Sequence, residues 1–234
     1  MSSLRPALVA ISHGTSSPDG QRVIEELVAA VAAALPDVEV RLGHVDVQDP
    51  DVATVLASLP AGQPAVVVPL LLSAGYHVHV DLTKATAADT VTLTAALGPH
   101  DSLVDLLVRR LEAAVSDLAD PASRIVLVAA GSSDARAVAD CRTTAEALSA
   151  RLGREVSLAF LSAAEPRLDA HVAEIRRDDP EARIVAASYL LAPGYFQSLA
   201  EKGGADVITA PLLAVGDADP AELVGIVLDR YRTA

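Results

Sequence analysis

Two histidines and one aspartate are the residues of this chain best placed to do chemistry, because each lies at the end of an apolar run. His13 directly follows ALVAIS, Asp46 ends the run VEVRLGHVDV, and His77 follows AVVVPLLL after a short loop. Neutral imidazole binds Fe, Co, Ni and Zn, and carboxylate adds a harder, charged donor. Imidazole also accepts protons near neutral pH. These residue types predict a site that holds a metal ion and removes protons.

The chain is internally duplicated, and only the first copy carries these histidines. ALVAISHGT in the first copy corresponds to IVLVAAGS in the second, and PLLLSAGYH corresponds to SYLLAPGYF. Gly14 and Gly75 are 61 positions apart, and Gly131 and Gly194 are 63 apart. His13 corresponds to Ala130, and His77 corresponds to Phe196. One site on a scaffold of two domains is therefore expected.

Both copies alternate strand-like apolar runs with helical patterns, which predicts an α/β fold. We expect two similar α/β/α domains, each with a roughly four-stranded parallel sheet, over residues 1–118 and 123–234, joined by the polar segment DLADPASR. Strands are predicted over 7–12, 38–47, 65–72, 90–97, 124–130, 155–162, 183–191 and 205–213. Helices are predicted over 16–35, 50–59, 77–88, 102–118 and 135–152, from Pro166, over 195–202, and from about Pro220.

The predicted fold brings the three polar residues to one edge. Ligands of open α/β sheets bind beyond the carboxyl ends of the strands, where His13, Asp46 and His77 are expected to meet. The alternative is that His13 only caps a turn and His77 only satisfies a helix start. The segment GTSSPDG lacks the spacing of a phosphate loop and is interpreted as a helix-entry loop whose N–H groups can bind a carboxylate.

The remaining histidines are weaker candidates. If the segment after Gly75 is helical, Asp81 pairs with His77 at i,i+4 and His79 turns away, whereas in a strand all three share a face. His44 lies deeper in its strand and is interpreted as a packing or surface residue. His100 and His171 are interpreted as surface residues in helix-start and helix contexts.

Composition narrows the function classes. The 234 residues carry a formal net charge of −13, which argues against nucleic acid and anionic membrane surfaces as partners. A single cysteine, Cys141, is interpreted as a structural thiol and fits a reducing cytosol. No segment is typical of a signal peptide or a membrane span, so a cytoplasmic protein is expected.

The stretches SHGTSSPDG, HVDVQDP and PLLLSAGYHVHVDL resemble those of the class II tetrapyrrole chelatases, specifically the sirohydrochlorin ferrochelatase and cobaltochelatase group. The resemblance covers essentially the whole chain, including the duplicated form of these enzymes. Members usually carry a glutamate at the end of strand two, where Asp46 stands here. Tyr76 stands where a small residue is common. In the second copy, Ala130, Ser162 and Phe196 occupy the three corresponding positions.

The resemblance implies insertion of Fe²⁺ or Co²⁺ into sirohydrochlorin, for sirohaem or cobalamin synthesis, with the metal as substrate and without an organic cofactor. It implies that His13 and His77 bind the metal and accept the pyrrole protons, with Asp46 as the supporting acid. The carboxylates of sirohydrochlorin then need local donors, for which Gly14, Thr15, Ser73, Tyr76, Lys84 and Arg22 are candidates.

Two other functions stay open at this point. The same residues would suit a non-catalytic carrier of metal or tetrapyrrole. A hydrolase using His13 and Asp46 is disfavoured because the sequence has no GxSxG motif or suitably placed nucleophile. The duplication itself supplies two lobes with an expected substrate cleft between them, so a monomer is expected. Phe196 and its neighbours are expected to form the wall of this cleft opposite the histidines.

Overall fold

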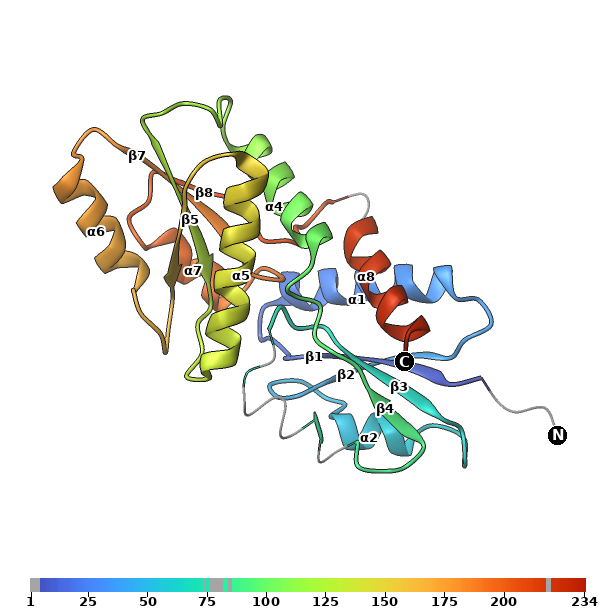
Figure 1. Ribbon diagram of the computed structural model, residues 1–234. Helices are drawn as coiled ribbons and strands as arrows, with labels where there is room; N and C mark the ends of the chain where they lie inside the picture. The colour runs from blue at the N-terminus through green and yellow to red at the C-terminus, as the bar shows by residue number, and fades with distance from the viewer. Residues whose placement is uncertain (1–4, 74, 76–81, 84–85, 218–219) are drawn as a thin grey trace. The chain divides into compact units, whose positions relative to one another are not determined.

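A computed structural model describes the chain except residues 1–4, 74, 76–81, 84–85 and 218–219. The chain forms two compact units (Figure 1). The first combines Met1–Leu97 with Asp217–Ala234, and the second comprises Gly98–Gly216. Each contains a four-stranded sheet, and all strand pairs in both sheets are parallel. The predicted α/β class with two similar sheets is confirmed.

The first sheet has the order β2-β1-β3-β4. Its strands are β1 (Ala7–Ser12), β2 (Val40–His44), β3 (Ala65–Pro69) and β4 (Val91–Leu93), and its helices are α1 (Pro18–Ala34), α2 (Val52–Ala57) and α8 (Ala221–Arg232). Every residue of β1 and β3 is buried. Their unbroken apolar sequences suit central parallel strands, which have both faces covered by helices.

The second sheet repeats this order as β6-β5-β7-β8. Its strands are β5 (Ser123–Ala129), β6 (Val156–Phe160), β7 (Arg183–Tyr189) and β8 (Val207–Ile208). Its helices are α4 (Asp101–Ala114), α5 (Ala135–Leu152), α6 (Leu168–Asp178) and α7 (Tyr195–Glu201). The register is also repeated, because Ser12 pairs with His44 across β1 and β2 as Ala129 pairs with Phe160 across β5 and β6.

The closing helix of each repeat belongs to the unit of the other repeat, so the units differ from the predicted domains 1–118 and 123–234. Helix α8 packs on α1 and β3 (Figure 1). Its Tyr231 hydroxyl donates to the Pro6 carbonyl oxygen at 2.7 Å. Helix α4 packs on α5 and β7, and Arg110 donates to the Leu212 carbonyl oxygen at 2.7 Å. An amphipathic pattern shows that a helix needs an apolar surface, but it does not show which sheet supplies that surface.

Strand ends account for most other differences from the predicted elements. The second predicted strand, 38–47, is shorter, because β2 ends at His44 and Asp46 lies in the loop that follows. Strand β3 ends at Pro69, three residues before its predicted end, and β4 ends at Leu93, four residues before its predicted end. The helix predicted over 77–88 falls mostly outside the described residues. In the described part of the chain, no helix has the length and apolar character needed to cross a membrane.

Cys141 should behave as the structural thiol that its sequence context predicts. It is buried on α5, and burial raises the pKa of its thiol to about 11. Because the thiolate is the reactive form, native protein should react with a disulfide reagent such as DTNB far more slowly than protein unfolded in guanidinium. Equal rates under the two conditions would contradict the burial of this side chain.

Candidate functional site

His13 lies directly after β1, in the turn that leads into α1. Its side chain is exposed, whereas the whole of β1 before it is buried. The turn ends at Ser17, whose hydroxyl caps α1 by accepting a hydrogen bond from the Gly20 N–H at 3.3 Å. The segment GTSSPDG is therefore a helix-entry loop, as predicted.

Asp46 lies in a tight loop, residues 45–51, that is bonded to the end of β1. The N–H of Val45 donates to the Ser12 carbonyl oxygen and that of Asp46 donates to the His13 carbonyl oxygen, both at 2.9 Å. Val47 takes a left-handed conformation at φ 68°. The Asp46 side chain is exposed and accepts from the Val47 N–H at 2.7 Å. The structure thus brings His13 and Asp46 onto directly bonded segments, although not at the end of a strand.

Gly14 allows this close approach of the two segments. Its φ is +94°, and a Cβ atom placed on it would lie 1.9 Å from the Asp46 carbonyl oxygen. Any other residue would be strained in this conformation and would also clash with the loop. Gly14 therefore acts through its backbone in holding Asp46 beside His13.

His44, the residue that ends β2, is buried and has a polar partner, which its sequence position does not indicate. Its Nδ1 lies 2.8 Å from the Ser12 Oγ, and each of the two residues is 4% exposed. Burial lowers the pKa of His44, and the carboxylates of Glu25 and Asp49 oppose this shift. Burial therefore favours the neutral form of the ring. The packing role considered for His44 is correct, but its polar partner Ser12 was missed.

The third part of the predicted site is only partly described. The chain leaves β3 beside β1, where the Leu70 N–H donates to the Ile11 carbonyl oxygen at 2.7 Å and Ser73 is half-buried. The predicted site residues Tyr76, His77 and Lys84 lie outside the described residues, as do His79 and Asp81. Within the described residues, no three His, Cys, Asp or Glu side chains are grouped to hold a metal ion.

Two of the predicted carboxylate donors already have partners. The Thr15 N–H donates to the Gln48 Oε1 at 2.8 Å, and Arg22 donates to Asp19 at 2.7 Å. Gln48 is a further residue of the loop cluster formed by residues 13–17 and 45–51. The sequence did not reveal it, because a lone glutamine in a polar segment carries no pattern. A carboxylate that binds the Thr15 N–H has to displace this side chain.

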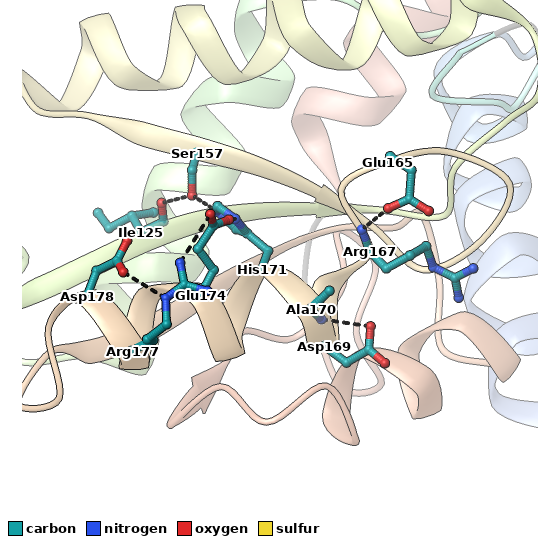
Figure 2. Close-up of polar contacts among 10 residues, drawn as sticks. All are labelled: Ile125, Ser157, Glu165, Arg167, Asp169, Ala170, His171, Glu174, Arg177 and Asp178. Carbon is teal, nitrogen blue, oxygen red and sulfur yellow. Dashed lines mark hydrogen bonds and ion pairs between the residues drawn. The ribbon is translucent and has the colours of Figure 1, made fainter.

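The histidines outside this region have structural roles. His100 caps α4, its Nδ1 accepting from the Ser102 N–H at 3.1 Å. Figure 2 shows His171 on α6 directed at Ser157 of β6, with its Nε2 2.9 Å from the hydroxyl oxygen. Its Nδ1 lies 3.8 Å from a Glu174 oxygen, and the His171 side chain is only 17% exposed. Both residues are half-buried and not surface histidines as predicted, because each has a polar partner at a helix start or a sheet edge.

The fold and the sequence identify the family. The family model of CbiX matches residues 7–114 and 124–199, and the chain belongs to this family. A sirohydrochlorin cobaltochelatase of Methanococcoides burtonii is 27% identical over 120 residues, which are 44% of this chain and 92% of that protein. The predicted resemblance to the class II chelatases is confirmed.

Solved structures share the complete duplicated fold. SirB from Bacillus subtilis, solved with Fe³⁺, has a TM-score of 0.76 at 19% identity, covering 97% of this chain and 94% of its own. CbiX, described as the terminal enzyme for siroheme biosynthesis in denitrifying bacteria, has a TM-score of 0.67 at 18% identity, covering 95% of this chain and 98% of its own. At these identities the likeness concerns the fold.

Proposed function

We propose that this protein inserts a divalent metal ion, Fe²⁺ or Co²⁺, into sirohydrochlorin at the carboxyl edge of the first sheet. In this proposal His13 and His77 bind the metal and accept the pyrrole protons, and Asp46 is the supporting acid. Membership of the CbiX family and the similarity to a sirohydrochlorin cobaltochelatase support the reaction.

One structural observation carries the assignment of His13 and Asp46. The Asp46 N–H donates to the His13 carbonyl oxygen at 2.9 Å, and the Ser162 N–H donates to the Ala130 carbonyl oxygen at 2.8 Å in the second copy. The same backbone arrangement thus carries an imidazole and a carboxylate in one copy, and a methyl group and a hydroxyl in the other. Because the fold is maintained without them, the imidazole and carboxylate are not needed for folding.

The chemistry requires weak metal binding together with proton removal. A metal-free tetrapyrrole carries two inner N–H protons, and M²⁺ replaces both, so that one ion enters and two protons leave. Two imidazoles and one carboxylate leave coordination positions open, which allows the ion to move to the macrocycle. Neutral imidazole can accept the leaving protons near neutral pH. These donors suit Fe²⁺ and Co²⁺ alike.

The substrate's carboxylates must be bound by local donors, because the protein carries a net charge of −13. We propose that Gly14, Thr15, Ser73, Tyr76 and Lys84 provide these contacts. The helix-entry loop supports this proposal, since N–H groups at the start of a helix attract anions. Arg22 lies in the first turns of α1, but its ion pair with Asp19 weakens it as a candidate.

The test is to mix the protein with metal-free sirohydrochlorin and either Co²⁺ or, without oxygen, Fe²⁺, and to follow the visible spectrum. We expect insertion faster than in protein-free buffer, with catalytic turnover. Binding of Co²⁺ or sirohydrochlorin without faster insertion would contradict the proposed chelatase activity and indicate a carrier function. Equilibrium dialysis with Co²⁺ alone measures the binding that both functions share.

A further inference from the structure

Ser12 and His44 form a buried polar pair at the ends of two neighbouring strands. They are cross-strand partners at the last position of β1 and β2. The Ser12 Oγ and the His44 Nδ1 are 2.8 Å apart, and each residue is 4% exposed. The pair lies beside the loop cluster, because Ser12 precedes His13 and His44 is two residues before Asp46.

The second copy has an apolar pair at the same register. Ala129 and Phe160 are the last cross-strand partners of β5 and β6 and are 2% and 1% exposed. A methyl group and a phenyl ring replace the hydroxyl and the imidazole. The chain therefore contains both versions of this position, one polar and one apolar, each fully packed.

The backbone around the two pairs is the same. The His44 N–H donates to the Pro50 carbonyl oxygen at 3.0 Å, as the Phe160 N–H donates to that of Pro166 at 2.9 Å. In both copies the two residues after β2 or β6 donate to the end of β1 or β5, at 2.8 to 3.0 Å. Gly14 and Gly131 have φ values of 94° and 93°. The Ser12–His44 hydrogen bond is therefore not needed to form the loop.

Stability does not account for the polar pair either. On burial the imidazole and the hydroxyl exchange their hydrogen bonds to water for one bond to each other, so the net gain in stability is small. Replacement of both partners by apolar groups of suitable shape is often neutral or stabilising. The apolar version in the second copy shows that the fold accommodates it. A gain in stability therefore does not explain why the polar pair stands in the copy that carries His13.

We propose that Ser12 and His44 are a positioning pair for the metal-insertion site, an inference that rests on the proposed function. Their side-chain bond is a further link between the segment of His13 and the segment of Asp46, in addition to the two backbone hydrogen bonds from Val45 and Asp46 and the bond from the Thr15 N–H to Gln48. It restricts relative movement of these two segments. Catalysis is sensitive to such movement, because a misplacement of about 1 Å can reduce a rate about 100-fold.

The test converts the pair to its counterpart in the second copy, using Ser12→Ala, His44→Phe and the double variant. Each single variant leaves a buried polar group without its partner and should lower the melting temperature. The double variant should regain a melting temperature close to wild type. The kcat for Co²⁺ insertion should fall about tenfold or more in all three, with KM for sirohydrochlorin within about twofold, because all three lack the same bond.

Conservative variants separate positioning from packing. His44→Asn places an amide nitrogen or oxygen near the position of Nδ1 and should retain most of the kcat, whereas His44→Gln places it nearer Nε2 and should not. The reciprocal control, Ala129→Ser with Phe160→His, introduces the polar pair into the second copy and should leave kcat unchanged.

The outcomes distinguish the two proposals. A double variant with wild-type kcat, in a protein whose wild type inserts Co²⁺, would overturn the positioning role and leave the proposed function intact. A double variant that loses activity and stability in parallel would also overturn it, because that result indicates packing alone. A wild-type protein that does not accelerate insertion would overturn both proposals.

Discussion

Replacement of His13 by alanine should reduce the rate of Co²⁺ insertion into sirohydrochlorin by at least about 100-fold. A positioned general base contributes about 10² to 10⁴-fold, and His13 is proposed to bind the metal in addition. Stability should change little, because the side chain is exposed and Ala130 already stands at this position in the second copy. Initial rates from the visible spectrum, with thermal unfolding of the same samples, measure both quantities.

His171→Ala is the matched control for this variant. It also removes an imidazole, but one that bonds to Ser157 in the second sheet. Loss of that partly buried hydrogen bond should cost about 1 kcal/mol of stability and leave the insertion rate near wild type. If His13→Ala retains wild-type activity, or if His171→Ala loses as much as His13→Ala, the assignment of His13 is wrong.

Gly14→Ala should have the largest effect on stability of any single methyl group added near the site. The residue would sit at φ +94°, and its Cβ would lie 1.9 Å from the Asp46 carbonyl oxygen unless the loop moved. Backbone strain alone costs about 1–3 kcal/mol, and the clash adds to it. We expect a loss of at least about 3 kcal/mol in the free energy of unfolding, and a lower kcat in the fraction that remains folded, because Asp46 is displaced.

The second copy again supplies the control. Gly131 has φ +93°, and a Cβ atom there would lie 1.8 Å from the Ser162 carbonyl oxygen. Gly131→Ala should therefore destabilise its own unit by a similar amount, while the folded protein keeps a kcat closer to wild type. Denaturant unfolding of both variants measures the losses. A Gly14→Ala variant as stable as wild type would contradict the close approach of the two segments.

Much of the architecture was predictable because its signals are local. The unbroken apolar run of β1 is typical of a central parallel strand, and it forms over the predicted residues Ala7–Ser12. Helix α5 has the predicted bounds, Ala135–Leu152, because Asp134 caps its start and Gly153 ends it in a left-handed conformation. The alignment of the two repeats paired His13 with Ala130 and Asp46 with Ser162, and the two pairs make the same backbone hydrogen bond.

The features that were not predicted depend on contacts between distant segments. The Ser12–His44 bond joins residues 32 positions apart, and neither of the two segments carries a local signal that these side chains meet. The Thr15–Gln48 contact joins two loops and is equally without a local signal. Asp46 was placed at a strand end because the residues of the predicted strand 38–47 alternate in polarity. In the structure, backbone hydrogen bonds to Ser12 and His13 hold this residue in a loop instead. The placement of His77 stays a prediction.

The exchange of closing helices has a consequence for how the protein is made. The first unit needs α8, whose Arg230 donates to the Ala96 carbonyl oxygen at 3.0 Å, so its apolar face is incomplete until α8, which follows the second unit in the chain, has left the ribosome. The second unit, Gly98–Gly216, is continuous in sequence and can fold first during synthesis. The unit that carries the proposed chemistry thus matures after the unit that lacks it, which is available earlier in a folded state during translation.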